Sequence, residues 1–258
     1  MCHKKLFFCL MTSFISILIA CKKENNSPLI EETGSIAGAI NVYDDKTNKL
    51  SDASGFTVSV IGNPGKIAVT NASGQFKIDG LPFDNYDLSF SKIGYGTYKI
   101  FGIEHLKKSN LPAGSVSVTQ ISRVINLGAL STTSVSLLSV VDATYNDLPG
   151  IEYSYVLNPA PTTNNRGYVR AFLGKKSTTT STEYTAYSAV KSALSNNVKS
   201  GFTAEELYGL GFESGDSVYV KLYGESYFSN QYIDPGTGKA IFPNLNAVSP
   251  SAIGFLVP

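Results

Sequence analysis

From residue 34 onward, hydrophobic and polar residues alternate in short runs. The runs are SIAGAINVY (35–43), FTVSVIG (56–62), KIAVTN (66–71), QFKIDG (75–80) and NYDLSFSKIG (85–94). The turn-forming groups Asn63-Pro64-Gly65, Ala72-Ser73-Gly74 and Leu81-Pro82-Phe83-Asp84 separate them. Alternation is typical of strands with one buried face, and strands about ten residues apart are typical of sandwiches and barrels. The pattern predicts a β-sandwich domain over residues 34–130.

The same pattern continues to the end of the sequence. INLGAL (125–130) is expected to close the first domain, and STTSVSLLSVVDATY then starts a new series. Further runs are GIEYSYVLN (150–158), GYVRAFLG (167–174), DSVYVKLYGES (216–226) and KAIFPNL (239–245). They predict a second sandwich, of immunoglobulin or fibronectin type III character, over residues 131–258. The expected fold class is therefore all-β, with two β-sandwich domains.

One short helix is expected inside the second domain. Thr203-Ala204-Glu205-Glu206 has the spacing of a capping box, in which Thr and Glu satisfy backbone N–H groups at a helix start. Gly209 and Gly211 follow within a few residues and favour an early end.

The first 20 residues have a different pattern. Lys4 and Lys5 precede the uncharged stretch 6–20. At ~1.5 Å per residue that stretch makes a helix of ~22 Å, which is shorter than a ~30 Å hydrocarbon core and typical of a signal peptide. The segment KKENNSPLIEET (22–33) is polar and predicts a flexible tether.

Leu18-Ile19-Ala20-Cys21 resembles the lipobox of bacterial lipoproteins. The resemblance implies that the Cys21 thiol receives a diacylglyceryl group and that cleavage leaves the acylated Cys21 as the first residue. The alternative is an ordinary signal peptide in which Cys21 is incidental. We expect a signal peptide at 1–20, a lipidated Cys21 with its tether at 21–33, and an anchor in the outer membrane. The chain would then face the periplasm or the cell surface.

Cleavage before Cys21 would change the inventory of reactive groups. Cys2, Cys9 and His3 would be removed, which leaves no free thiol and makes His105 the only histidine. Loss of two lysines reduces the 21 Lys and Arg residues to 19, against 20 Asp and Glu. A disulfide scaffold, a thiolate zinc site and a cysteine nucleophile are excluded for that chain. The near-neutral charge argues against nucleic acid as a partner, and we expect no cofactor.

The stretch from residue 34 to about residue 130 resembles the carboxypeptidase regulatory-like domain. The matching motifs are Gly34-Ser35-Ile36-Ala37-Gly38, Thr70-Asn71-Ala72-Ser73-Gly74-Gln75-Phe76, Leu81-Pro82-Phe83-Asp84-Asn85-Tyr86-Asp87-Leu88 and Gly94-Tyr95. The resemblance implies a seven-stranded, transthyretin-like sandwich of a kind common in surface and outer-membrane proteins of the Bacteroidetes. Every one of these motifs concerns packing or a turn, so the resemblance implies a fold and no activity.

Candidate catalytic and metal-binding groups are few. His105 has no Gly-x-Ser-x-Gly motif to accompany it, and we expect it to be exposed or bonded locally in a loop. The acidic pairs Glu31-Glu32, Asp44-Asp45 and Glu205-Glu206 are expected to be solvated charges. DDKTNKLSD (44–52) lacks the ligand pattern of a calcium loop, and DPGTGK (234–239) is expected to be a hairpin turn. We therefore expect no catalytic residues, no metal ligands and no enzyme.

Binding is the remaining chemistry. The stretch VYVKLYGESYFSNQYIDP contains the candidate ligand-binding residues Tyr219, Tyr223, Tyr227 and Tyr232. In a strand, Val218, Val220 and Leu222 would form the core face, which leaves Tyr219 and Tyr223 outward with Lys221. Exposed aromatic rings suit stacking on sugars. The alternative is that these tyrosines shield the sandwich or pack between the domains.

Three functions remain open after the sequence. The first is a non-catalytic, membrane-anchored binding or scaffolding module that contacts another cell-envelope protein. The second is a glycan-binding accessory lipoprotein of a glycan-uptake system, and the third is a hydrolase. The first is favoured because the family resemblance is to accessory modules.

Overall fold

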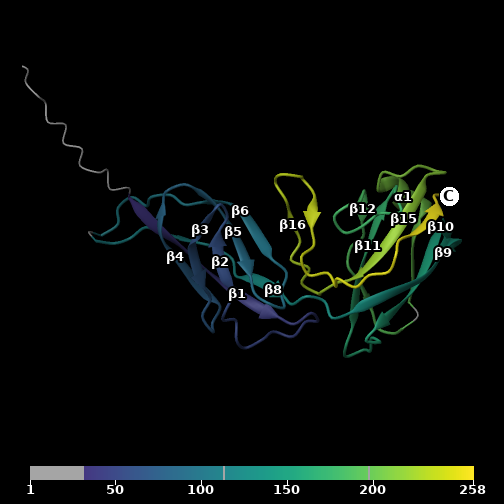
Figure 1. Cartoon of the computed structure of the whole chain (residues 1–258), viewed down its shortest axis with the longest axis horizontal. Helices are drawn as coiled ribbons and strands as arrows, with labels where there is room; N and C mark the ends of the chain where they lie inside the picture. Colours follow the sequence, from purple (N-terminus) through teal and green to yellow (C-terminus); the bar gives the residue numbers. More distant parts are fainter. Residues whose placement is uncertain (1–31, 113, 197) are drawn as a thin grey trace, which may run out of the picture. The chain divides into compact units, whose positions relative to one another are not determined.

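Two sheets form where the first half of the sequence alternates. The computed structural model describes residues 32–112, 114–196 and 198–258 (Figure 1). One sheet contains β4 (Gln75–Pro82), β1 (Thr33–Tyr43), β7 (Val118–Gln120) and β8 (Ile125–Gly128). The other has the order β3 (Asn63–Val69), β2 (Thr57–Val60), β5 (Asn85–Ser91) and β6 (Tyr98–Glu104). The two sheets enclose one hydrophobic core, which contains Ile36, Ile40, Val58, Phe76, Leu81, Leu88 and Phe90 among others.

The long strand β1 organises this sandwich. It pairs antiparallel with β4 and parallel with both β7 and β8. Residues 118–120 pair with the first half of β1 and residues 125–128 with its second half, so β7 and β8 are successive pieces at one strand position. The described part of this sandwich therefore has eight strands at seven positions, and the family resemblance implied seven strands.

One predicted turn is displaced. Asn63-Pro64-Gly65 is the beginning of β3 and not a turn, because Ile61-Gly62 makes the reversal and Gly62 takes φ +83°. Pro64 is tolerated there because β3 is an edge strand. The predicted turn Ala72-Ser73-Gly74 is present, but it connects β3 in one sheet to β4 in the other and does not make a hairpin. Gly74 takes φ +77°, and the Asn71 side-chain oxygen accepts from the Gln75 N–H at 2.9 Å.

A second set of strands follows from residue 134. One sheet has the order β14 (Val198–Thr203), β10 (Leu148–Asn158) and β9 (Ser134–Tyr145). The other has the order β12 (Ala186–Tyr187), β11 (Gly167–Gly174), β15 (Ser217–Gly224) and β18 (Ile253–Leu256), with β13 (Lys191–Ala193) also on β11. Their facing side chains form a second core, which includes Ile151, Tyr153, Tyr155, Val169, Leu173, Val218 and Leu222. The predicted all-β fold class is confirmed.

The expected helix and the expected hairpin are both present. α1 (Ala204–Gly209) has the complete capping box, with Thr203 Oγ1 accepting from Glu206 N–H and the Glu206 carboxylate accepting from Thr203 N–H. β16 (Tyr232–Ile233) and β17 (Ala240–Ile241) pair around the turn 234–239. Asp234 Oδ1 accepts from the backbone N–H groups of Gly236 and Thr237, which fixes this turn.

The described strands divide between residues 128 and 134. However, residues 32–258 form one compact unit, so the predicted boundary between 130 and 131 stays a prediction. The predicted signal peptide at 1–20 and all but the last two residues of the predicted tether at 21–33 lie outside the described residues, as does Cys21. Within 32–112, 114–196 and 198–258, no helix reaches the length and apolarity that a membrane span requires.

Candidate functional site

The tyrosine-rich strand β15 has the two faces that its alternation predicts. Val218, Val220 and Leu222 are fully buried in the second core. Tyr219 and Lys221 lie on the outer face of the sheet and are partly exposed. The strand therefore has an outer surface that a ligand could reach, at least over its first half.

Tyr223 is not part of that open surface, and the expectation that it points outward to solvent is wrong. It is 8% exposed and packs edge-to-face on Phe172 with 5.5 Å between the ring centroids. A third, smaller cluster covers this end of the outer face; it contains Phe172, Tyr184, Tyr187, Tyr223, Ala240, Phe242 and Leu245. The cover comes from β12, β17 and the irregular segments beside them, which the periodicity of β15 alone does not reveal.

The other two tyrosines lie elsewhere. Tyr232 of β16 packs against Tyr98 and Phe101 of β6, with ring centroids 6.2 and 5.9 Å apart. Tyr227 is 50% exposed, and its ring contacts Tyr168 at 5.5 Å. For Tyr223 and Tyr232, the structure has the arrangement that the sequence left open as the alternative, namely shielding and contact between sandwiches. The four tyrosines do not form one binding surface.

Tyr219 is the member of this group whose partly exposed ring lines a hollow. A Cβ atom on Gly254 of the neighbouring strand β18 would lie 2.9 Å from Tyr219 Cε1, so the ring covers the glycine closely. The hollow has a volume of about 240 Å³, and its walls are Ser217, Tyr219, Gly254, Phe255 and Leu256. Leu256 is 59% exposed, which adds an aliphatic surface next to the ring. The arrangement suits a ligand with an apolar face.

A buried ion pair lies behind the aromatic cluster. Arg170 of β11 is 4% exposed and Glu225 is fully buried, and Arg170 Nε donates to Glu225 Oε2 at 2.9 Å. The guanidinium also donates to the Ser188 carbonyl oxygen at 2.6 Å and lies 4.4 Å from the Phe242 ring centroid. Burial raises the pKa of Glu225 to about 7, and Arg170 opposes that rise. Both charged groups bond to other groups of the protein, and neither faces an open cleft.

Sequence reasoning missed this pair, although one signal for it was present. Arg170 is the only charged residue in the run 167–174, which is otherwise nearly all apolar and is therefore typical of a strand that is buried on both faces. A lone arginine there needs a buried partner, because an unpaired charge in an apolar interior is strongly disfavoured.

A second set of polar groups, two buried and one half-buried, joins the two sandwiches. We define the polar junction as Asp45, Asn230 and Asn244. Asn244 is fully buried; its Oδ1 accepts from Gly96 N–H at 3.1 Å, and its Nδ2 donates to Asn230 Oδ1 at 2.6 Å. Asn230 Oδ1 also accepts from Gly128 N–H at 2.9 Å. Asn230 and Asn244, which flank the β16–β17 hairpin, thereby accept hydrogen bonds from backbone N–H groups of the first sandwich.

Asp45 completes the polar junction and corrects an expectation. It is 7% exposed, and its Oδ2 accepts from both the backbone N–H and the hydroxyl of Thr132, at 2.9 and 2.8 Å. Its own carbonyl oxygen accepts from Tyr227 N–H at 3.1 Å. Asp44 instead caps the following turn by accepting from Lys46 N–H and Asn48 N–H. The pair Asp44-Asp45 is thus not a pair of solvated charges, because Asp45 is buried between elements far apart in sequence.

His105 was expected to be exposed or bonded locally in a loop, but it is buried and its side-chain partner lies 14 residues away in the sequence. It follows β6 and is 0% exposed, with Nδ1 2.8 Å from Thr119 Oγ1. Its ring lies against Phe83 with 4.9 Å between centroids. Burial lowers the pKa of His105 below its usual value because the charged form would be desolvated. A neutral, enclosed imidazole of this kind is a packing group.

His105 should therefore make the stability of the protein depend on pH. Its pKa is lowered in the folded state, so below about pH 6.5 the unfolded chain binds a proton that the folded chain does not. Folding free energy is then lost as the pH falls through the folded-state pKa. Urea unfolding of the wild type and His105→Gln between pH 8 and pH 5 should show a stability difference that shrinks as the pH falls. A difference that stays constant over this range would show that His105 does not titrate differently on unfolding.

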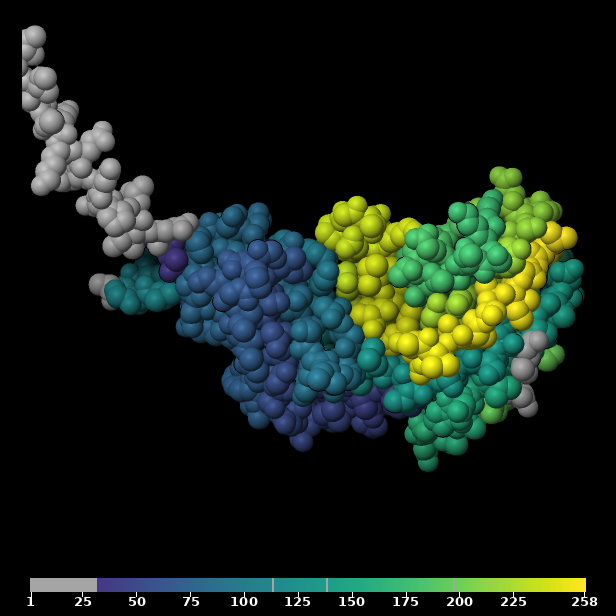
Figure 2. All heavy atoms as spheres, in the orientation of Figure 1, coloured from purple at the N-terminus to yellow at the C-terminus, as the bar shows by residue number. Residues whose placement is uncertain are grey.

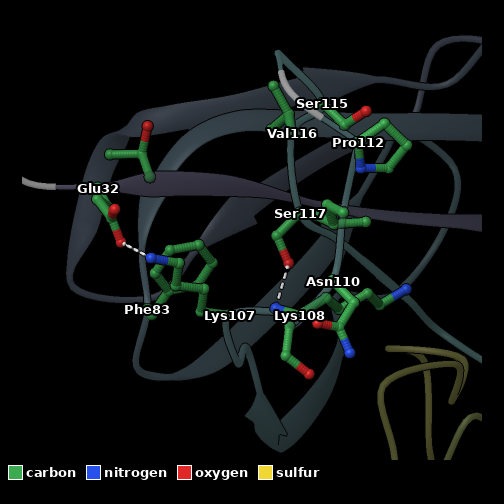
Figure 3. A pocket seen from close by; sticks show the side chains of 12 residues that line it. Glu32, Phe83, Lys107, Lys108, Asn110, Pro112, Ser115, Val116 and Ser117 are labelled. Carbon is green, nitrogen blue, oxygen red and sulfur yellow. Dashed lines mark hydrogen bonds and ion pairs between the residues drawn. The ribbon is translucent and has the colours of Figure 1, made fainter.

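A larger hollow lies where β1 begins (Figure 3). Its volume is about 410 Å³, and its walls include Glu32, Phe83, Lys107, Lys108, Leu111 and Val116. Lys107 Nζ is 2.5 Å from Glu32 Oε2, and Ser117 Oγ accepts from the backbone N–H of Lys108 at 3.1 Å. The hollow is shallow and mixed in polarity. Across the described ranges, no group of three or more His, Cys, Asp and Glu side chains is placed to hold a metal ion.

Comparison with known proteins finds remote structural similarity. No family model and no curated protein matches this chain. A type II cohesin–X–dockerin complex from Acetivibrio cellulolyticus matches at 20% identity and TM-score 0.29, over 38% of this chain and 59% of the other. A DUF3823 family protein from Bacteroides ovatus matches at 13% identity and TM-score 0.29, over 88% and 100%. A proposed carbohydrate-binding protein from Bacteroides uniformis matches at 11% identity and TM-score 0.28, over 86% and 98%. Similarity at this level assigns no function to the chain.

Proposed function

We propose that this chain is a non-catalytic binding or scaffolding module of a bacterial cell envelope. Acyl chains on Cys21 hold it in the outer membrane, and residues 22–33 connect that anchor to the first strand. The first sandwich is of the carboxypeptidase regulatory-like type. The module faces the periplasm or the cell surface, where it holds a protein or glycan partner at the end of the tether.

The polar junction is the observation that supports a scaffold. Asp45, Asn230 and Asn244 bond across elements that are far apart in sequence, and each is turned to another protein group. Buried polar groups that are fully bonded favour one arrangement of the elements they join. A module that carries a partner at a fixed place needs such an arrangement. Arg170 and Glu225 likewise bond to each other and line no open cleft.

The anchor is tested by replacing Cys21 with serine. A hydroxyl cannot form the thioether, so we expect the Cys21→Ser chain to leave the membrane fraction or to accumulate as an unprocessed precursor. Cys9→Ser is the matched control, since Cys9 lies inside the uncharged stretch 6–20 and should fractionate as wild type. A Cys21→Ser chain that is processed and sediments with membranes as wild type does would contradict the anchor.

Tyr219 favours a second candidate function, the binding of a glycan. Its ring lies at the surface beside the hollow that Gly254 and Leu256 help to form. Lys221 follows on the same outer face and could donate hydrogen bonds to hydroxyl groups. Sugar rings have an apolar face that stacks on aromatic side chains, with hydroxyls around the rim.

Affinity electrophoresis of the detergent-solubilised chain in polysaccharide gels tests this second function. If Tyr219 stacks on a sugar, Tyr219→Ala should weaken retardation by about tenfold in Kd, or about 1.4 kcal/mol. Tyr227→Ala is the matched control, because Tyr227 is 50% exposed, packs on Tyr168 and does not line this hollow. No retardation in any polysaccharide, or equal retardation of wild type and Tyr219→Ala, would rule out this site.

A further inference from the structure

One end of the first sandwich brings together the start of β1 and the segment after β6. Thr33 pairs with Pro82 at the end of β4, and the His105 N–H donates to the Asp84 carbonyl oxygen at 2.9 Å. The Ser35 N–H donates to the Ser117 carbonyl oxygen, also at 2.9 Å. Figure 2 shows the segment that follows β6, in teal, beside the purple start of β1. The chain that leads back to Cys21 therefore leaves the sandwich at this end.

Exposed aliphatic and basic side chains gather on that segment. Leu106 is 63% exposed, Leu111 39% and Val116 56%, and Lys107 and Lys108 lie between the first two in sequence. We call Leu106, Lys107, Lys108, Leu111 and Val116 the basal patch. Single exposed aliphatic residues are common on protein surfaces, but four of these five side chains line one hollow. An exposed cluster of apolar side chains with a polar rim usually marks a site that binds another molecule or a membrane.

The length of the chain between Cys21 and β1 indicates which surface the basal patch contacts. Cys21 and Glu32 are 11 residues apart in the sequence, so the first sandwich cannot be farther than about 36–40 Å from an acylated Cys21. That limit applies to the end of the sandwich that carries the basal patch, since Glu32 lines the same hollow and pairs with Lys107. This step depends on the lipid anchor proposed above. An anchored chain keeps the basal patch within reach of the bilayer at all times.

We propose that the basal patch docks on the surface of the phospholipid bilayer. Leu106, Leu111 and Val116 enter the boundary between headgroups and acyl chains, which removes their apolar surface from water. Lys108 keeps its aliphatic stem beside them and places its ammonium group among lipid phosphates. Lys107 does the same when its exposed ion pair with Glu32 is exchanged for a phosphate. Docking would orient the first sandwich so that the Glu104 end of β6 faces the membrane and the Tyr98 end lies farther from it.

The proposal is tested with a fluorophore on single cysteines. An acylated Cys21 leaves no free thiol, so Leu111→Cys gives one labelling site on the processed, full chain. Ile93→Cys is the matched control, because Ile93 is 100% exposed in the turn at the other end of β6. Seven residues of strand separate these two ends by about 23 Å. Each labelled protein is reconstituted into vesicles of phosphatidylethanolamine and phosphatidylglycerol that carry doxyl-labelled lipid.

We expect the label at position 111 to be quenched at least about twofold more than the label at position 93. Adding Leu106→Ser and Lys108→Glu to the Leu111→Cys chain should bring its quenching down to the control value. Equal quenching at the two positions, whether low or high, overturns the docking while co-flotation with the vesicles still supports the anchor. A processed chain that fails to co-float contradicts the anchor itself, and the docking proposal then fails with it.

Discussion

Replacing Arg170 with alanine should lower the free energy of unfolding by about 3–5 kcal/mol. The substitution leaves the Glu225 carboxylate, which is fully buried, without its cation at 2.9 Å. It also removes the bond to the Ser188 carbonyl oxygen and the guanidinium that packs 4.4 Å from the Phe242 ring centroid. The cost is large because Glu225 must then either hold an uncompensated charge or take up a proton in a site that excludes water. Urea unfolding at pH 8 measures this cost above the wild-type pKa of Glu225, which is about 7; without Arg170 that pKa rises further, because Arg170 lowers it in the wild type.

Two further variants separate the buried charge from a general loss of contacts. Lys77→Ala breaks a surface ion pair with Asp79, in which both side chains are more than half exposed, and should cost no more than about 1 kcal/mol. Arg170→Met combined with Glu225→Leu removes both buried charges and should recover much of the loss caused by Arg170→Ala. If Arg170→Ala unfolds at the same urea concentration as Lys77→Ala, then breaking the buried Arg170–Glu225 pair costs no more than breaking a surface ion pair, which contradicts this prediction.

Replacing Asn244 with alanine should be the second most damaging change. The Gly96 N–H and the Phe228 carbonyl oxygen would lose their partners, and each buried, unsatisfied group costs about 1–3 kcal/mol. The loss falls between the two hydrophobic cores and not inside either of them. We therefore expect the calorimetric unfolding transition of the wild type to split into two in Asn244→Ala, with one sandwich unfolding before the other.

Asn41→Ala is the control for Asn244→Ala. Asn41 Nδ2 donates to Asn126 Oδ1 at 3.0 Å in an exposed bond between β1 and β8, inside the first sandwich. Its loss should change the free energy of unfolding by at most about 0.5 kcal/mol and leave the shape of the transition unchanged. A single, unshifted transition in Asn244→Ala would mean that the polar junction does not couple the sandwiches.

Most strands could be predicted from local sequence because one face of each is buried. In β15, Val218, Val220 and Leu222 alternate with partly exposed residues, and all three are in the second core. The capping box at Thr203 was predictable for a similar reason, because its hydrogen bonds are local to one helical turn. By contrast, β12 and β13 have only two and three residues and are held by pairing with β11. Such short pieces show no periodicity that a sequence could reveal.

The misplaced candidate residues share one physical cause. Alternation says which face of its own strand a residue occupies, but not what later packs on that face. Tyr223 was therefore expected outside, although β12, β17 and the irregular segments beside them cover it. Asp45 was expected in solvent for the same reason, although Thr132, 87 residues away in sequence, bonds to its carboxylate. Contacts between distant segments fix the site, and no local pattern contains them.

The mass of the N-terminal peptide tests the central claim of a lipid-anchored module most directly. The protein would be purified from the membrane fraction, digested and examined by mass spectrometry. The account predicts a first residue at Cys21 that carries a diacylglyceryl group on sulfur and an amide-linked acyl chain on nitrogen. An N-terminal peptide that begins at any other residue, or that begins at an unmodified Cys21, would contradict it.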